Sequence, residues 1–119
     1  MIATDHAPHS LEEKSKGLKD SSFGIVGLET AFPVLYTHLV KKNIISLEKL
    51  VKLMAINPRE RFGLPLENSF SVWDLNEEYL INSEDFLSMG KSTPFENMKV
   101  YGKNLLTVHN GKIVYSIGR

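Results

Sequence analysis

Three side chains that could do chemistry lie within the first nine residues: Asp5, His6 and His9. An active-site carboxylate can take a proton and return it, and carboxylate and imidazole groups are common zinc ligands. The plainer interpretation is that Asp5 caps the turn formed by His-Ala-Pro and that both histidines are solvated loop residues. Because D-x-x-x-H is a short pattern with many accidental matches, its spacing leaves both interpretations open.

The residues around Asp5 indicate which element positions it. Residues 1–4, Met-Ile-Ala-Thr, are apolar or tolerated in strands, and an apolar run that ends in an acid is typical of a buried parallel strand at an active-site face. Pro8 ends any β ladder there, because it has no N–H to donate and its φ is fixed. We therefore expect Asp5, His6 and His9 at a strand end and on the loop that follows.

A hydrophilic loop and a glycine-containing segment come next. Residues 10–22 are rich in charged side chains, and we expect either a solvated connection or a lid over an active site. Gly24 and Gly27 leave the backbone bare, which permits close approach to a ligand or an unusual φ. An ordinary tight turn before a helix would produce the same pattern.

Apolar periodicity predicts helices in the middle of the chain. Helical spacing covers residues 28–42, with Pro33 either in the first turn or at a kink. Asn43 is the expected left-handed residue at its end. Ser46 is the expected N-cap of a second helix that ends near residue 55. A short helix follows over residues 57–62, with Gly63 just past its end. The second helix is expected to bury one face, formed by Leu47, Leu50, Val51 and Met54.

The last third of the chain has the alternation of short strands. They are expected at residues 70–75, 79–81, 99–101, 105–109 and 112–116. Asn110-Gly111 between the last two is a strong type I′ hairpin signal. His109 beside that turn is expected on the surface, and His38 on the first long helix is expected to be structural.

Composition narrows the class of protein. The 42% hydrophobic and 24% charged content is that of an ordinary globular protein. Fourteen basic and fourteen acidic residues cancel, so we expect no nucleic acid and no membrane surface as partner. Without cysteine there is no disulfide and no thiolate zinc site. Apolar runs are short and no signal peptide precedes them, which predicts a cytoplasmic protein without a membrane span.

Two motifs at a defined separation resemble a known family. Residues 5–9 read Asp-His-Ala-Pro-His, Glu13-Lys14 follows, and residues 23–30 read Phe-Gly-Ile-Val-Gly-Leu-Glu-Thr. Together they resemble the eighth-strand region of the dihydroorotases, in the bacterial single-function class. The resemblance extends over nearly the whole chain through Asn57-Pro58, Phe62-Gly63-Leu64, Thr93-Pro94-Phe95 and residues 110–114.

The resemblance implies an α/β fold in two parts. Residues 1–64 would be the end of a (β/α)8 amidohydrolase barrel, with its last strand and the following helices, and residues 65–119 would be strands of a small β-sandwich. Residues 65–75 are shorter than the family counterpart, so the edge of that sandwich is expected to differ. Family members are much longer, and their metal site begins with a His-x-His pair that this chain lacks. The resemblance therefore implies a carboxy-terminal fragment.

The resemblance also implies an activity and its residues. Dihydroorotases reversibly hydrolyse the cyclic amide of dihydroorotate to N-carbamoyl-aspartate in de novo pyrimidine biosynthesis, with one or two zinc ions. Asp5 matches the residue that transfers the proton and contacts a zinc, His9 matches the histidine that holds the substrate carboxylate, and Phe23 and Gly24 match the dipeptide whose backbone binds the ring. His6 is expected to give structural support rather than a metal ligand.

Three interpretations of the chain remain open. In the first, it is a piece of a dihydroorotase, inactive alone, and its partners are the remainder of the parent chain and a small-molecule substrate. In the second, it is a non-catalytic module that forms a homo-oligomer or joins aspartate transcarbamoylase. In the third, the parent is a related cyclic amidohydrolase, such as allantoinase or dihydropyrimidinase. The His-Ala-Pro-His and Gly-Ile-Val-Gly-Leu-Glu-Thr motifs together favour dihydroorotase.

Overall fold

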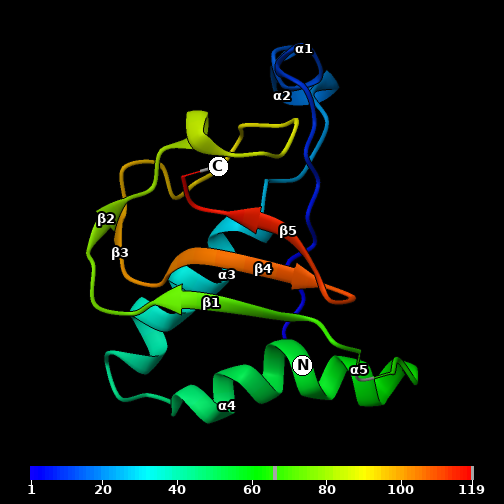
Figure 1. Cartoon of the computed structure of the whole chain (residues 1–119). Helices are drawn as coiled ribbons and strands as arrows, with labels where there is room; N and C mark the ends of the chain where they lie inside the picture. The colour runs from blue at the N-terminus through cyan, green and yellow to red at the C-terminus, as the bar shows by residue number, and fades with distance from the viewer. Residues whose placement is uncertain (66, 119) are drawn as a thin grey trace.

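A three-stranded antiparallel sheet in the order β1-β4-β5 lies at the centre of the molecule, with helices packed beside it (Figure 1). The computed structural model describes residues 1–65 and 67–118. Leu66 and Arg119, which belong to the predicted segment 65–119, lie outside the described residues. The strands are β1 (Phe70–Asp74), β4 (Lys103–His109) and β5 (Lys112–Ser116). The α/β class is confirmed.

The predicted turn joins β4 to β5. His109 pairs with Lys112, and between them Asn110 and Gly111 have φ values of 48° and 75°. A type I′ turn requires positive φ at both central positions, so the hairpin prediction is confirmed. His109 is exposed beside the turn, as expected.

A second, two-stranded sheet pairs β2 (Tyr79–Leu80) with β3 (Lys99–Val100). Between these strands the chain forms a short 3-10 helix, η3 (Ser83–Asp85), and an irregular segment. Each predicted strand from residue 70 onward forms within two residues of its expected bounds. The alternation of apolar and polar residues therefore predicted the strands of this part of the chain correctly.

The predicted buried strand at the start of the chain does not form. Residues 1–9 are extended, and their one ladder contact is an isolated parallel bridge between His6 and Ile25. Met1, Ala3 and Asp5 are exposed. A parallel strand is stabilised by a ladder of hydrogen bonds to neighbouring strands. In the described part of the chain this segment has only the bridge at His6 and scattered backbone hydrogen bonds, such as that from Ile2 N–H to the Leu53 carbonyl at 2.9 Å.

The loop over residues 10–22 contains two single-turn helices, α1 (Leu11–Lys14) and α2 (Gly17–Asp20). They form an arm that projects from the body of the molecule (Figure 1). A hydrophilic loop was expected here, and these two short helices were not, because the capping signal of α1 was overlooked. Ser10 and Glu13 form a capping box, in which each side chain accepts a hydrogen bond from the backbone N–H of the other residue.

The predicted helix over residues 28–42 is present as α3 (Leu28–Leu35) followed by a π-helical segment, η1 (Tyr36–Val40). Pro33 lies inside α3 and is buried. Because proline has no N–H and its ring crowds the preceding turn, the regular ladder is disturbed, and the wider turn follows it. There Lys41 N–H donates to the Tyr36 carbonyl at 2.9 Å. The segment ends with Asn43 at a φ of 57°, as its position predicted.

The second predicted helix and the short helix after it form one continuous helical segment: α4 (Leu47–Val51), η2 (Lys52–Ile56) and α5 (Asn57–Phe62). Ser46 caps its start by accepting from the Lys49 amide at 3.1 Å, and Gly63 ends it with a φ of 62°. Both caps were predicted.

The buried face of α4 is narrower than expected. Leu50 is fully buried, and Leu47 and Met54 are half-buried. Val51 is exposed, contrary to the prediction. The sheet and α3 lie along one side of this helical segment (Figure 1), so only a narrow stripe of its surface is covered.

Residues on either side of position 65 pack against each other. The rings of Phe32 on α3 and Trp73 on β1 have centroids 4.3 Å apart. The Thr37 hydroxyl accepts from the Tyr101 amide at 2.8 Å, and the ammonium of Lys41 lies 3.5 Å from the centre of the Tyr101 ring. The predicted barrel and sandwich segments are thus in direct contact.

Apolar side chains remain exposed on the three-stranded sheet. They include Phe70 and Val72 on β1 and Ile113 and Val114 on β5. Among the described residues, the fully buried apolar side chains are few and separated along the chain: Val26, Pro33, Leu50 and Val100. No helix in the described ranges is long and apolar enough to cross a membrane.

Candidate functional site

Two segments from the family-like motifs lie side by side. Ala7 N–H donates to the Ile25 carbonyl at 2.9 Å, next to the bridge between His6 and Ile25. The approach is so close that a Cβ on Gly24 would collide with the Cβ of Ala7. A Cβ on Gly27 would lie 3.0 Å from the Thr4 carbonyl oxygen. Gly24 therefore has no room for a side chain and Gly27 has little, because the segment that contains Thr4 and Ala7 packs directly against them.

His6 ties this pair of segments to α3. Its Nδ1 accepts a hydrogen bond from the Gly27 amide at 3.1 Å and lies 3.4 Å from the Leu28 amide. The N-cap of α3, Gly27, has no side chain to satisfy these first amides. His6 therefore caps the helix from outside it, with the ring proton on Nε2 in the neutral form. The prediction that His6 gives structural support agrees with this geometry.

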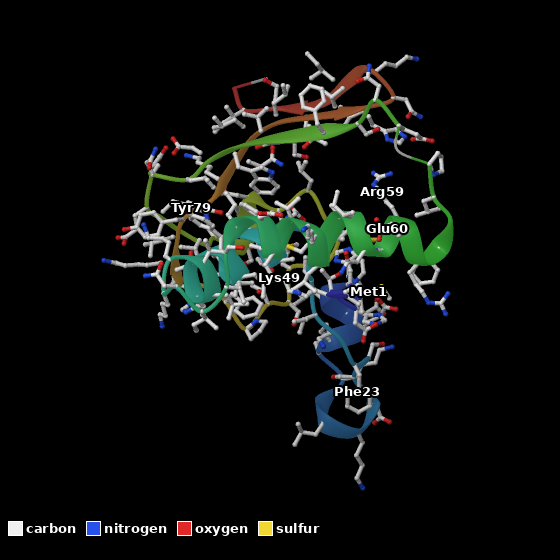
Figure 2. All side chains as sticks on the ribbon, turned by 90° about the horizontal axis from the view of Figure 1, so that it is seen from below. Met1, Phe23, Lys49, Arg59, Glu60 and Tyr79 are labelled. Carbon is white, nitrogen blue, oxygen red and sulfur yellow. The ribbon has the colours of Figure 1, made fainter. Side chains whose placement is uncertain are left out.

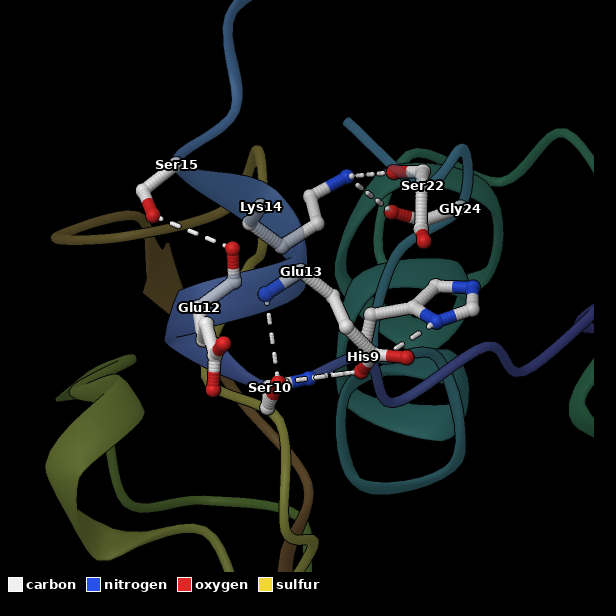
Figure 3. Close-up of polar contacts among 8 residues, drawn as sticks. All are labelled: His9, Ser10, Glu12, Glu13, Lys14, Ser15, Ser22 and Gly24. Atoms are coloured by element: carbon white, nitrogen blue, oxygen red, sulfur yellow. Dashed lines mark hydrogen bonds and ion pairs between the residues drawn. The ribbon is translucent and has the colours of Figure 1, made fainter. Parts of the chain in front are cut away.

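His9 lies next to the capping box of α1 (Figure 3). Its Nδ1 is 3.7 Å from Glu13 Oε2, and about one third of its side chain is exposed. Glu13 also accepts from the backbone N–H of Ser10 at 2.8 Å and from the Ser10 hydroxyl at 3.0 Å. These Ser10 hydrogen bonds, followed by the charge of His9, hold the pKa of Glu13 below its ordinary value. Glu13 is thus a carboxylate at neutral pH.

Lys14 connects α1 to the segment that contains Phe23 and Gly24. Its ammonium donates to the carbonyls of Ser22 and Gly24, both at 2.9 Å (Figure 3). The Glu13-Lys14 pair therefore holds both ends of the arm, with Glu13 at the His9 end and Lys14 at the Gly24 end. Sequence reasoning used this pair only as a motif, although the Ser10-x-x-Glu13 spacing is a recognised capping signal.

The four predicted site residues lie on these neighbouring segments. Asp5 is exposed, with a φ of 48°, and His9 follows after the turn at Pro8, where His9 N–H donates to the Ala7 carbonyl at 2.9 Å. Gly24 lies against Ala7, and Phe23 is 85% exposed on the projecting arm (Figure 2). The aromatic ring therefore makes little contact with the rest of the chain.

The described residues do not form a metal centre by themselves. Among residues 1–65 and 67–118, no group of three or more His, Cys, Asp or Glu side chains could hold a metal ion. A catalytic zinc ordinarily has three protein ligands. Asp5 could supply one carboxylate, and His6 already uses Nδ1 as a hydrogen-bond acceptor. The chain alone does not fit a zinc site.

A third segment, which sequence reasoning missed, also contacts this region. Gly90 lies so close to it that a Cβ there would be 2.6 Å from the Pro8 carbonyl carbon and 2.7 Å from the His9 carbonyl oxygen. Val26 N–H donates to the Ser92 carbonyl at 2.9 Å. Contacts across more than sixty residues leave no local signal in a sequence, apart from the glycine itself.

Known proteins with similar sequences are dihydroorotases. The chain is 56% identical to the dihydroorotase of Fusobacterium nucleatum over 122 residues and 50% identical to that of Ligilactobacillus salivarius over 123 residues, covering 97% of this chain in each case. It is 48% identical to the Bacillus subtilis dihydroorotase over 126 residues, covering the whole chain. The chain spans only 29% of the length of each of these relatives.

Two solved structures have a fold similar to that of this chain. A dihydropyrimidinase from Brevibacillus agri matches with a TM-score of 0.85 and a D-hydantoinase from a Bacillus species with 0.83, each at 22% identity. Both alignments cover 94% of this chain and less than a third of the other chain. At this identity the likeness establishes the fold alone.

No family model matches the sequence. The identity to curated relatives nevertheless extends across both motifs and over nearly all of the chain. The chain therefore belongs to the dihydroorotase family and corresponds to 29% of the length of each of these relatives.

Proposed function

We propose that this chain is part of a dihydroorotase and contributes substrate-binding and proton-transfer groups to hydrolysis of the cyclic amide of dihydroorotate. The observation that carries the proposal is the pairing of residues 5–9 with residues 23–27, which brings both halves of the family-like motif together. The identity of about 50% to dihydroorotases supports the same activity.

Asp5 is proposed as the proton-transfer residue. In the hydrolysis, the oxygen of a water molecule adds to the ring carbonyl carbon and the C–N bond of the ring breaks. The carboxylate takes the proton of the attacking water and returns it to the leaving nitrogen, which gives N-carbamoyl-aspartate. The exposed position of Asp5, free of the packing that surrounds Ala7, suits a group that must reach a substrate.

His9 and the Phe23-Gly24 backbone are proposed to hold the substrate. When protonated, the His9 ring carries N–H groups that can pair with the substrate carboxylate in a charge-assisted hydrogen bond. The hydrogen bond from the Lys14 ammonium to the Gly24 carbonyl, 2.9 Å long, holds the Phe23-Gly24 backbone next to α1. Pre-organisation of this kind lowers the entropic cost of binding.

Zinc is proposed only for an assembly larger than this chain, with Asp5 as the ligand that the chain contributes. By the same proposal, residues 1–64 form the end of a barrel and residues 65–119 part of a sandwich. The chain alone is proposed to be inactive, because most groups that surround the substrate would come from the remaining share of a relative's length. Cytoplasmic localisation, a homo-oligomer and association with aspartate transcarbamoylase remain predictions.

The test is a hybrid enzyme in which this chain replaces the matching segment of the Fusobacterium nucleatum dihydroorotase. The hybrid should hydrolyse dihydroorotate, lose activity on chelation and regain it with zinc, whereas the chain alone should not turn over. Asp5→Asn should lower kcat at least about 100-fold. Asp20→Asn, at an exposed acid on the arm, serves as the matched control. A folded hybrid without activity, or one indifferent to Asp5→Asn, would contradict the proposal.

A further inference from the structure

Glu29, in the first turn of α3, makes a cluster of hydrogen bonds with a segment far along the chain. Its Oε2 accepts from the Leu87 amide at 2.7 Å, and its Oε1 accepts from the Ser88 amide at 3.1 Å. The Ser88 hydroxyl donates to the same oxygen. One carboxylate thus receives three donors from two consecutive residues, and hydrogen bonds to a charged acceptor are stronger than neutral ones.

The segment held by Glu29 continues directly onto the candidate site. Two residues after Ser88, Gly90 packs against the backbone of Pro8 and His9 without room for a Cβ. Two residues further, the Ser92 carbonyl accepts from the Val26 amide at 2.9 Å. Residues 87–92 therefore contact both segments of the candidate site, residues 5–9 through Gly90 and residues 23–27 through Ser92.

The side chains of this segment make few other contacts that could hold it. Leu87 and Met89 are about 80% exposed, so apolar burial contributes little to its position. The Lys91 ammonium donates to the Phe86 carbonyl at 2.6 Å and to the Glu84 carbonyl at 3.4 Å, which links the segment to the residues that directly precede it. Glu29 is therefore the main attachment of residues 87–92 to α3, the helix that follows residues 23–27 of the candidate site.

We propose that Glu29 is a positioning residue: it holds residues 87–92 against the backbone of His9 and Val26, and thereby sets where His9 and Gly24 meet the substrate. The substrate part of this inference rests on the proposed function. Glu29 itself does not touch the reacting atoms, since its carboxylate is occupied by Leu87 and Ser88.

Amide hydrogen exchange in the full 119-residue chain tests the attachment without any activity. Glu29→Ala should speed exchange of the Leu87 and Ser88 amides at least about tenfold, and that of the Val26 amide as well, because its acceptor is released. Glu29→Gln, which keeps one acceptor oxygen for Ser88 but turns an NH2 group toward Leu87, should be intermediate. The matched control is Glu96→Gln, since Glu96 also accepts a backbone amide, that of Ser83 at 2.9 Å.

Steady-state kinetics of the hybrid enzyme test whether Glu29 affects substrate binding through His9 and Gly24. Glu29→Ala should raise KM for dihydroorotate about tenfold and change kcat by less than about threefold, as expected for lost positioning in the ground state. Gly90→Ala, which leaves Glu29 intact but forces the segment away from Pro8, should raise KM in the same way. Glu96→Gln should leave KM unchanged.

The outcomes separate this inference from the proposed function. If the wild-type hybrid does not hydrolyse dihydroorotate, the proposed function fails, and fast exchange at Val26 in Glu29→Ala would still support the attachment. If Val26 exchange is unchanged in Glu29→Ala, or if KM is unchanged in the Glu29→Ala variant of an active hybrid, the positioning role of Glu29 is overturned, whatever Gly90→Ala does.

Discussion

The Nδ1 atom of His6 accepts the backbone N–H of Gly27 at 3.1 Å and so closes the start of α3. The two residues lie on neighbouring segments of the candidate site, and His6 comes directly after Asp5. This hydrogen bond couples the segment that carries Asp5 to the helix that carries Glu29. His6 is thus a helix cap supplied from another segment of the chain.

We expect His6→Ala to lower the free energy of unfolding of the chain by about 1 kcal/mol, the usual cost of a lost helix cap. His6→Asn should be destabilised much less than His6→Ala, because the Asn side-chain oxygen lies about where Nδ1 does and can accept the same hydrogen bond from the Gly27 amide. Urea unfolding followed by circular dichroism measures both variants. Equal loss in His6→Asn and His6→Ala would show that ring packing, not capping, is responsible.

Gly24→Ala should destabilise the chain by about 2–4 kcal/mol, since the new Cβ collides with Ala7 and the φ of 121° disfavours an L side chain. Gly17→Ala is the matched control: its φ is 82° but nothing lies within 4 Å of the new Cβ, so only backbone strain of about 1 kcal/mol is expected. Thermal unfolding compares the two. Adding Ala7→Gly to Gly24→Ala should recover the collision part, and a lack of recovery would argue against close packing of the two segments.

Stability should fall in acid through Glu13. Its pKa in the folded chain is lowered from 4.5, chiefly by the Ser10 amide and hydroxyl. A depressed pKa stabilises the folded state above the unfolded value, and that stabilisation is lost as the pH falls through the folded pKa. The difference in urea midpoint between wild type and Glu13→Gln should therefore be present at neutral pH and shrink below about pH 4.

Glu12→Gln is the control for this pH series, because Glu12 lies on the same turn of helix and is exposed. It should leave the acid dependence of the midpoint unchanged. A constant difference between wild type and Glu13→Gln down to about pH 2 would contradict the capping-box explanation.

His9→Asn in the hybrid enzyme should raise KM for dihydroorotate about 10- to 100-fold, because a charge-assisted hydrogen bond to the substrate carboxylate is lost. The effect on kcat should be smaller. His109→Asn, at an exposed position beside the β4–β5 turn, should change neither constant. An unchanged KM in His9→Asn would remove His9 from the substrate site while leaving the role of Asp5 open.

Local sequence signals were sufficient wherever a structure depends on a few neighbouring residues. Ser46 and Gly63 mark the two ends of the helical segment from α4 to α5, and Asn110-Gly111 determines the β4–β5 turn. In each case the deciding interaction is a cap or a positive φ within a few residues. The same kind of signal at Ser10 and Glu13 was present in the sequence and would have predicted α1.

The two motifs, residues 5–9 and 23–30, also identified the segments of the candidate site, because residue types and their separation can be recognised in the sequence alone. Only the tertiary structure decided how those segments meet. Whether residues 1–5 form a strand depends on neighbours to which they can hydrogen-bond, and the described chain offers a single bridge at His6. The bonds from Leu87 and Ser88 to Glu29 join residues almost sixty positions apart, and a contact at that separation leaves no periodicity in the sequence from which it could be predicted.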